Sequence, residues 1–146
     1  MDVELHLDSS LEGIQVLVRA PARTEEVEAL LERLKEEPGR LTAFQSGRAI
    51  LLEPGEVLRF YGEDKEVRAQ TLNGEVRTVR LRLYELEERL DKRTFVRVSH
   101  SEIVNWKRVT ALDLSLSGTI RVTLEGGVTT YVSRRYVKKI KEVLGI

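Results

Sequence analysis

Between residues 41 and 132, turn-forming residues interrupt the chain at short intervals and leave only short apolar stretches between them. The clearest case is Asn73-Gly74, because Asn-Gly between alternating apolar runs is the strongest short-range signal for a β-hairpin. Short strands at this spacing predict a mainly β, antiparallel fold with edge helices (α+β), arranged as a small sandwich or meander. The expected strands cover residues 41–44, 50–52, 57–61, 67–72, 76–80, 111–116, 119–124 and 128–132.

Three further segments of this region depart from the short-strand pattern. Residues 83–90 predict a short helix with its leucines on one side, and residues 95–105 predict an irregular extended segment. A last helix is expected after Ser133, a residue type favoured at the N-cap. The apolar sides of the two helices comprise Leu83, Leu86 and Leu90, and Tyr136, Ile140, Val143 and Leu144.

The first 44 residues predict a separate β-β-α unit. Alternating apolar residues at Val3, Leu5 and Leu7, and again over 14–18, indicate two strands. Residues 24–36 then switch to helical spacing, with Thr24 as N-cap and Pro38-Gly39 as the stop signal. The apolar stripe of this helix comprises Val27, Leu30, Leu31 and Leu34. Such a unit is too small for a secure core of its own, so we expect it to pack on the rest of the chain or on another copy. The expected domains are residues 1–44, for dimerisation or signal input, and residues 45–146.

The formal net charge is zero, with 24 Lys/Arg and 24 Asp/Glu, but the charges are unevenly distributed. Residues 1–56 hold 6 basic and 12 acidic residues, whereas residues 92–146 hold 11 basic and 4 acidic residues. A basic C-terminal part suggests contact with a polyanion, while ordinary scatter of surface charge is the plain alternative.

Cysteine is absent, which excludes disulfides, a thiolate nucleophile and a sulfur-ligated metal site. The N-terminus lacks the basic and apolar regions of a signal peptide, and no apolar run approaches the roughly 20 residues that span a bilayer. We therefore expect a cytoplasmic protein.

Two segments near the C-terminus place polar side chains between apolar anchors: Phe95–Asn105 and Val132–Tyr136. Their side chains can donate to phosphate oxygens and base edges. Neither segment contains a reaction centre: Ser99 and His100 are adjacent, so they point to opposite faces of an extended segment, and no third group orients the histidine. We expect no enzymatic activity, no cofactor and no metal.

Residues 50–145 resemble a LytTR-type DNA-binding domain. The resemblance is carried by the helix at 83–90, the segment Phe-Val-Arg-Val-Ser-His-Ser-Glu-Ile-Val-Asn at 95–105, and Val-Ser-Arg-Arg-Tyr at 132–136. It implies small antiparallel sheets that read direct repeats in promoter DNA with loops and strand ends. The whole chain is similar to the stand-alone bacterial LytTR regulators. By that likeness a small membrane-protein inhibitor encoded nearby is expected. A homodimer is expected through the N-terminal unit, whose helix has an apolar stripe that its two strands cover poorly.

The resemblance also implies which side chains meet DNA. Arg135 aligns with a base-contacting arginine of the family. His100 occupies a base-reading loop where the family commonly has Arg, Lys or Asn. Lys65 and Glu66 occupy a third contact loop. Phosphate contact or support is expected from Arg97, Ser99, Ser101, Arg134, Lys138 and Lys139.

Two other classes of function stay open from the sequence. The basic face can instead meet an acidic protein partner, or the chain can bind RNA. Salt dependence alone does not separate these alternatives, because any polyanion releases counterions on binding.

Overall fold

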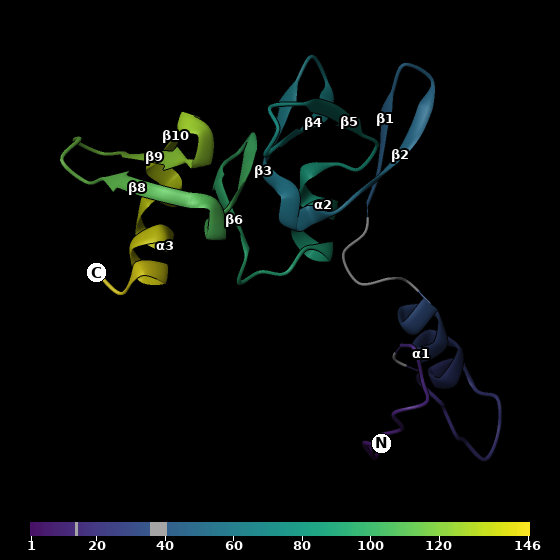
Figure 1. The fold of residues 1–146 in the computed structure, drawn as a ribbon. Coiled ribbons are helices and arrows are strands. Elements are labelled where there is room, and N and C mark those ends of the chain that lie inside the picture. Colours follow the sequence, from purple (N-terminus) through teal and green to yellow (C-terminus); the bar gives the residue numbers. More distant parts are fainter. Residues whose placement is uncertain (14, 36–40) are drawn as a thin grey trace. The chain divides into compact units, whose positions relative to one another are not determined.

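The computed structural model describes residues 1–13, 15–35 and 41–146. It divides into two compact units, Met1–Glu37 and Pro38–Ile146, which are described separately (Figure 1). A division after residue 44 would assign strand β1 (Leu41–Gln45) to the first unit, yet β1 pairs with strands of the second. Within the described ranges, no helix is both long and apolar enough to cross a bilayer.

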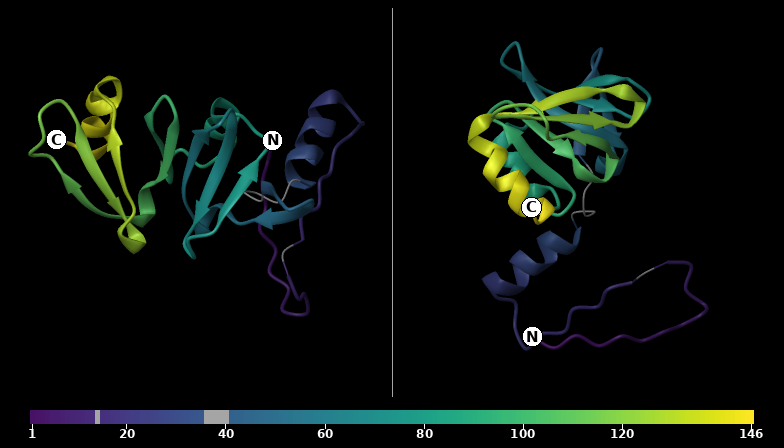
Figure 2. Two further views of the ribbon diagram at one scale, coloured as in Figure 1. Left: turned by 90° about the horizontal axis from the view of Figure 1, so that it is seen from above. Right: turned by 90° about the vertical axis from the view of Figure 1, so that its left-hand side faces the viewer.

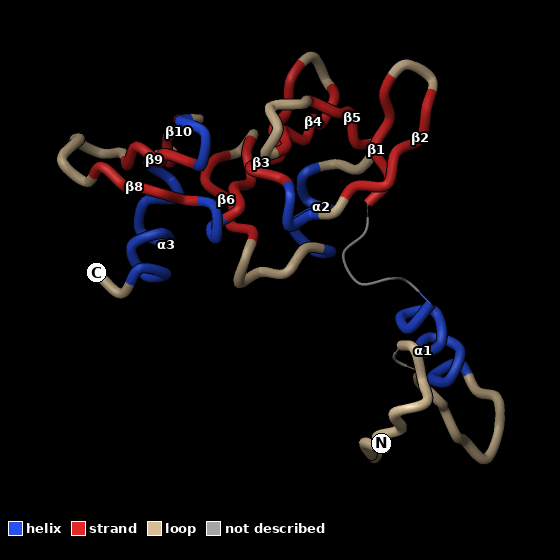
Figure 3. The backbone as a smooth tube through the Cα atoms, in the orientation of Figure 1, coloured by secondary structure: helices blue, strands red, loops and turns tan. Residues whose placement is uncertain are grey.

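The first unit contains helix α1 (Glu25–Lys35), which begins where the sequence predicts. Thr24 caps it: the backbone N–H of Val27 donates to the Thr24 hydroxyl over 3.3 Å. The two strands expected before this helix are absent from the described residues 1–13 and 15–24 (Figure 3). Alternation alone does not form a strand, because each strand needs a neighbour to satisfy its backbone groups. Ile14, Pro38 and Gly39 lie outside the described residues.

Most strands of the second unit form a seven-stranded sheet in the order β2-β1-β5-β4-β3-β7-β6. Every neighbouring pair for which a register is defined is antiparallel. The hairpin predicted at Asn73-Gly74 joins β4 and β5, and Gly74 adopts the positive φ of 80° that favours glycine. Besides β1, the strands are β2 (Arg48–Leu52), β3 (Val57–Glu63), β4 (Glu66–Thr71), β5 (Val76–Val79), β6 (Phe95–Ser99) and β7 (Glu102–Asn105).

A second, three-stranded sheet has the order β10-β9-β8 and lies beside helix α3 (Figure 2). Helix α2 belongs instead with the larger sheet. These elements are α2 (Leu83–Arg89), β8 (Val109–Asp113), β9 (Ile120–Leu124), β10 (Thr129–Val132) and α3 (Arg134–Leu144). The mainly antiparallel β fold with edge helices is therefore confirmed.

Two apolar clusters hold the second unit together. One lies between the larger sheet and α2, with Phe60 and Leu86 fully buried at its centre. The other lies between the smaller sheet, β6 and α3, and Ile140 anchors the helix in it. The predicted apolar side of α2 is confirmed, whereas Val143 of α3 is 52% exposed and does not face the core as expected.

The segment 95–105, expected to be irregular and extended, is a hairpin of β6 and β7 with one bulge. Val96 pairs with Val104, and a bulge follows Arg97 before the turn at His100 and Ser101. The turn contains no Gly, Asn or Pro, and its serines, Ser99 and Ser101, are a weaker turn signal. His100 therefore lies at the tip of a hairpin and not in an open loop.

Candidate nucleic-acid interface

Three chain reversals of the second unit contain the residues predicted to read DNA. We call them together the loop edge: the β3–β4 turn with Asp64 and Lys65, the β6–β7 turn with His100 and Ser101, and the β10–α3 junction with Ser133, Arg134 and Arg135. Strand pairing brings them together, because β3 lies beside β7, and β7 beside β6. Residues about 70 positions apart in the sequence therefore meet along one side of the domain.

Backbone hydrogen bonds fix these reversals to one another. The Gly62 N–H donates to the Ser101 carbonyl over 2.9 Å, which ties the β3–β4 turn to the β6–β7 turn. The Ser133 N–H donates to the Val98 carbonyl over 2.9 Å, which ties the start of α3 to β6. Backbone bonds of this kind hold the turns in place whatever their side chains do.

The β3–β4 turn presents Lys65 to solvent. Asp64 and Lys65 have φ angles of 53° and 65°, the left-handed pair that a tight two-residue hairpin requires. Lys65 is exposed, and no described residue binds its ammonium group. Glu66, in contrast, forms an ion pair with Arg68 over 3.4 Å, so its carboxylate is already engaged.

The β6–β7 turn is braced from inside by Arg97. Its Nε donates to the Ser99 carbonyl over 2.7 Å, and a second guanidinium nitrogen donates to the His100 carbonyl. A third contact is an ion pair of 3.0 Å with Glu87 of α2. The Arg97 side chain is only 11% exposed, so the structure gives it a supporting position under the turn.

Ser99 has a similar supporting position, because its hydroxyl accepts from the Ser101 N–H over 3.2 Å. His100 and Ser101 are exposed at the tip. The imidazole of His100 has no hydrogen-bond partner among the described residues. The side chain that the turn offers to a ligand is therefore that of His100.

The start of α3 places two arginines at the surface. Ser133 occupies the N-cap position with extended backbone, yet its hydroxyl makes no capping hydrogen bond. Arg134 lies against the β8–β9 turn: a Cβ on Gly118 would be 3.0 Å from its Nε. Arg135 is exposed, and nothing in the described part of the chain pairs with it. Lys138 and Lys139 are exposed one turn further along.

The β8–β9 turn beside Arg134 has its own local brace. The hydroxyl and the backbone N–H of Ser115 both donate to the Asp113 carboxylate. These hydrogen bonds, with a smaller contribution from Arg121, hold the pKa of Asp113 below its usual value. The turn thus carries a fixed negative charge at the end of β8.

A buried carboxylate that the sequence did not single out joins the two sheets. Glu102, only 6% exposed, follows directly after the β6–β7 turn. Its Oε1 lies 2.8 Å from an Arg59 guanidinium nitrogen on β3, and its Oε2 accepts from the Thr130 hydroxyl on β10. Buried charges are stable when paired and hydrogen-bonded, as here. The only signal in the sequence was a glutamate directly before an apolar pair, Ile103 and Val104.

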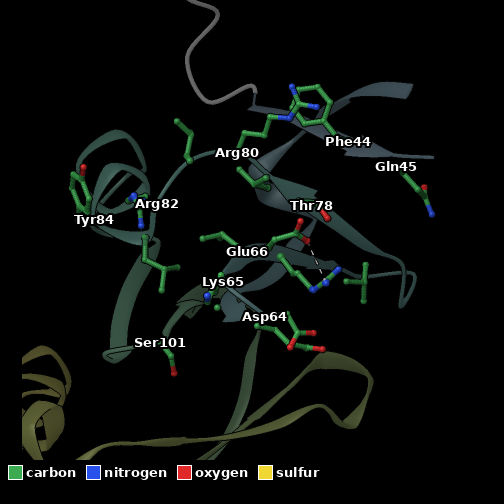
Figure 4. Close-up of a pocket in the computed structure, with 18 of the residues that line it drawn as sticks. Phe44, Gln45, Asp64, Lys65, Glu66, Thr78, Arg80, Arg82, Tyr84 and Ser101 are labelled. Atoms are coloured by element: carbon green, nitrogen blue, oxygen red, sulfur yellow. Dashed lines mark ion pairs between the residues drawn. The ribbon is translucent and has the colours of Figure 1, made fainter. Parts of the chain in front are cut away.

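A shallow hollow lies next to the β3–β4 and β6–β7 turns (Figure 4). Lys65 and Ser101 line it from the turns, while Arg80 and Arg82 line it from the segment after β5. Neither arginine was expected at the interface from the sequence, because both lie outside the contact loops that the resemblance implies. The basic surface therefore extends beyond the three turns.

Comparison with known proteins adds independent information. The model of the LytTr DNA-binding domain family matches residues 47–145. Uncharacterized HTH-type transcriptional regulators of Staphylococcus aureus strains NCTC 8325 / PS 47 and COL are each 32% identical to the chain over 148 residues, covering 100% of it and 99% of each relative. The solved LytTr DNA-binding domain of a Bacillus cereus protein shares this fold, with a TM-score of 0.70 at 23% identity, over 74% of this chain and 98% of that one.

Helices α2 and α3 do not form a helix-turn-helix pair. Five strands separate α2 from α3, so the described residues contain no pair of helices joined by a single turn. Lys65 and Arg135 are exposed at a hairpin tip and at a strand-helix junction, positions that the resemblance assigned to DNA contact, while other exposed basic residues such as Arg93 and Lys107 lie elsewhere. From the family match and the relatives it follows that this chain belongs to the LytTR family of DNA-binding transcriptional regulators.

Proposed function

We propose that the protein regulates transcription by binding direct repeats in promoter DNA through its loop edge. The observation that carries the proposal is the pair of backbone hydrogen bonds that hold the three reversals in register. A duplex can then be contacted at several points by side chains whose spacing is already set before binding. Such preorganisation lowers the ordering cost of association.

Different side chains receive different roles in this proposal. Lys65, His100 and Arg135 are exposed and unpaired in the described structure, so they are available to read base edges in successive grooves. Arg134, Lys138 and Lys139 contact phosphates and set the register of the protein on the duplex. Arg97 and Ser99 support the β6–β7 turn, and Glu66 stays paired with Arg68.

The N-terminal unit brings two copies of the protein together in this proposal. Its Val3, Leu5 and Leu7 are 82–89% exposed, an arrangement that favours association with another surface. Two linked domains on a repeat gain affinity through effective concentration. The family resemblance adds a second candidate partner for this unit, a small membrane protein that holds the regulator inactive, and a cytoplasmic location.

A direct test uses the full chain and a duplex selected with it from a random DNA library. The selected duplex should bind more tightly than a shuffled duplex of equal length and composition, at physiological salt. Single-stranded RNA of the same sequence and an acidic protein serve as competitors for the two rival functions. Equal competition by shuffled duplex would contradict sequence-specific reading, and stronger competition by RNA or by the acidic protein would favour the corresponding rival.

A further inference from the structure

The end of strand β5 lies at the loop edge, although the proposed function gives its arginines no role. In the sheet order, β4 lies between β3 and β5, and Val79 pairs with Val67 at the start of β4. Because β5 runs antiparallel to β4, the residues that follow Val79 emerge beside the β3–β4 turn. Arg80 and Arg82 therefore continue the basic edge past Lys65, on the side away from His100.

The chemistry of the hollow at this place favours an anion. Five Lys or Arg side chains and three carboxylates line it. Arg68 and Glu66 pair with each other, and Arg97 is bound to Glu87. Three cations, Lys65, Arg80 and Arg82, then remain beside the two carboxylates of Glu63 and Asp64. The Arg80 guanidinium lies 3.7 Å from the centre of the Phe44 ring (Figure 4). Stacking on an aromatic ring holds the guanidinium flat while leaving its edge N–H groups free for a ligand.

Two further observations point to donors that lack a partner. The Nε of Arg68 is buried, and no hydrogen-bond partner for it exists among the described residues. Arg82 is exposed next to Tyr84, whose side chain is 60% exposed. A guanidinium group can donate two parallel hydrogen bonds to two oxygens of a phosphate or of a carboxylate. A phosphate has a further oxygen that can accept from a second donor.

We propose that Arg80 and Arg82 contact the phosphate backbone of operator DNA on the flank of the base pairs that Lys65 contacts. The inference rests on the proposed function, since it extends the same interface along that flank. The hollow is open and continuous with the turns, as a surface that follows a duplex must be. The stacked Phe44 orients Arg80.

The experiment compares duplexes of different length. The probe is the duplex selected in vitro with the full chain, shortened from one flank and then from the other by a few base pairs. Shortening one flank should lower the affinity of the unchanged protein by about tenfold. This factor corresponds to the free energy that one hydrogen bond between charged groups contributes. The double variant Arg80→Gln/Arg82→Gln should lose this dependence on length and keep its preference for selected over shuffled sequence.

Salt dependence supplies a second readout. For each phosphate that the protein no longer neutralises, the slope of log affinity against log salt becomes shallower by about 0.9. Arg93→Gln is the matched control, because Arg93 is exposed and precedes β6 at the end of that strand opposite His100. It should leave both the length dependence and the slope unchanged. Arg82→Gln alone keeps the test valid if removal of the Arg80–Phe44 stacking destabilises the fold.

Three results would overturn the inference. One is a length dependence that is the same in the double variant and the unchanged protein. Another is a reduction of affinity in the Arg93→Gln control that is as large as the reduction in the double variant. A third is saturable binding of inorganic phosphate to the DNA-free protein below about 1 mM that the double variant lacks, in a protein whose DNA affinity does not depend on flank length. That result would assign the site to a small phosphorylated ligand. Failure of the proposed function looks different: the unchanged protein would then bind selected and shuffled duplexes equally.

Discussion

The two units of this protein use the same sequence pattern with opposite results. Val3, Leu5 and Leu7 alternate with polar residues in the first unit and are 82–89% exposed. Ile120, Val122 and Leu124 alternate in the same way in β9 of the second unit and are at most 1% exposed. The difference lies in the neighbours, since β9 pairs with β8 and β10 and is covered by α3. Period-two alternation therefore specifies which side a strand would bury, and only a partner sheet makes it bury that side.

The largest expected effect tests this contrast directly. Ile120→Ala should lower the free energy of unfolding of the second unit by about 2–5 kcal/mol, because it leaves a cavity in a close-packed core. Leu5→Ala should change the free energy of unfolding of the first unit by less than about 0.5 kcal/mol, as exposed substitutions do. Chemical denaturation of dilute protein measures both. A decrease of several kcal/mol in Leu5→Ala would mean that the first unit has a buried core after all.

Buried charge gives the next effect in size. Glu102→Ala should cost about 1–3 kcal/mol of stability, because the Arg59 guanidinium and the Thr130 hydroxyl lose their shared acceptor. Glu4→Ala is the matched control, since Glu4 and His6 form an exposed pair in the first unit. It should cost less than about 0.5 kcal/mol. The pairing of Glu102 with Arg59 would be refuted if a double-mutant cycle with Arg59→Met gave no coupling.

Removal of the first unit tests what its exposed apolar residues do. Deletion of residues 1–37 should leave the affinity for a single repeat nearly unchanged. It should weaken binding to a two-repeat duplex by about tenfold or more, roughly 1.4 kcal/mol, because effective concentration is lost. Sedimentation of both forms, with and without DNA, gives the comparison. If both forms are monomers and bind the repeat equally well, dimerisation through this unit is wrong.

The smallest effect comes from one turn motif that occurs in both units. Ser10 donates to Asp8 as Ser115 donates to Asp113, and both carboxyl groups have a lowered pKa. A depressed pKa contributes stability above the usual carboxyl value near 3.8, which is lost as pH falls through the folded pKa. Ser10→Ala and Ser115→Ala should each raise the neighbouring pKa toward that value in an NMR titration. An unchanged pKa would assign the shift to another cause.

Much of the second unit could be predicted because its signals are local. The hairpin at Asn73-Gly74, helix α2 and helix α3 each depend on residues a few positions apart. The β6–β7 turn was missed because it has no Gly or Asn and because a bulge breaks the alternation. Glu102, Arg59 and Thr130 are separated by 43 and 28 positions, so no local pattern could pair them. The Arg80–Phe44 contact likewise arises only when β1 joins β5.

The central claim is that the loop edge reads base sequence, and one comparison of variants tests it most directly. Arg135→Ala should reduce the preference for selected over shuffled duplex by about 1–3 kcal/mol. Lys139→Ala, an exposed cation in the same helix, should weaken both duplexes equally and lower the salt slope by about one unit. The measurement is fluorescence anisotropy of the full chain with both duplexes over a range of salt. If Arg135→Ala lowers both affinities by the same factor, Arg135 contacts only phosphate, which would contradict base reading by the loop edge.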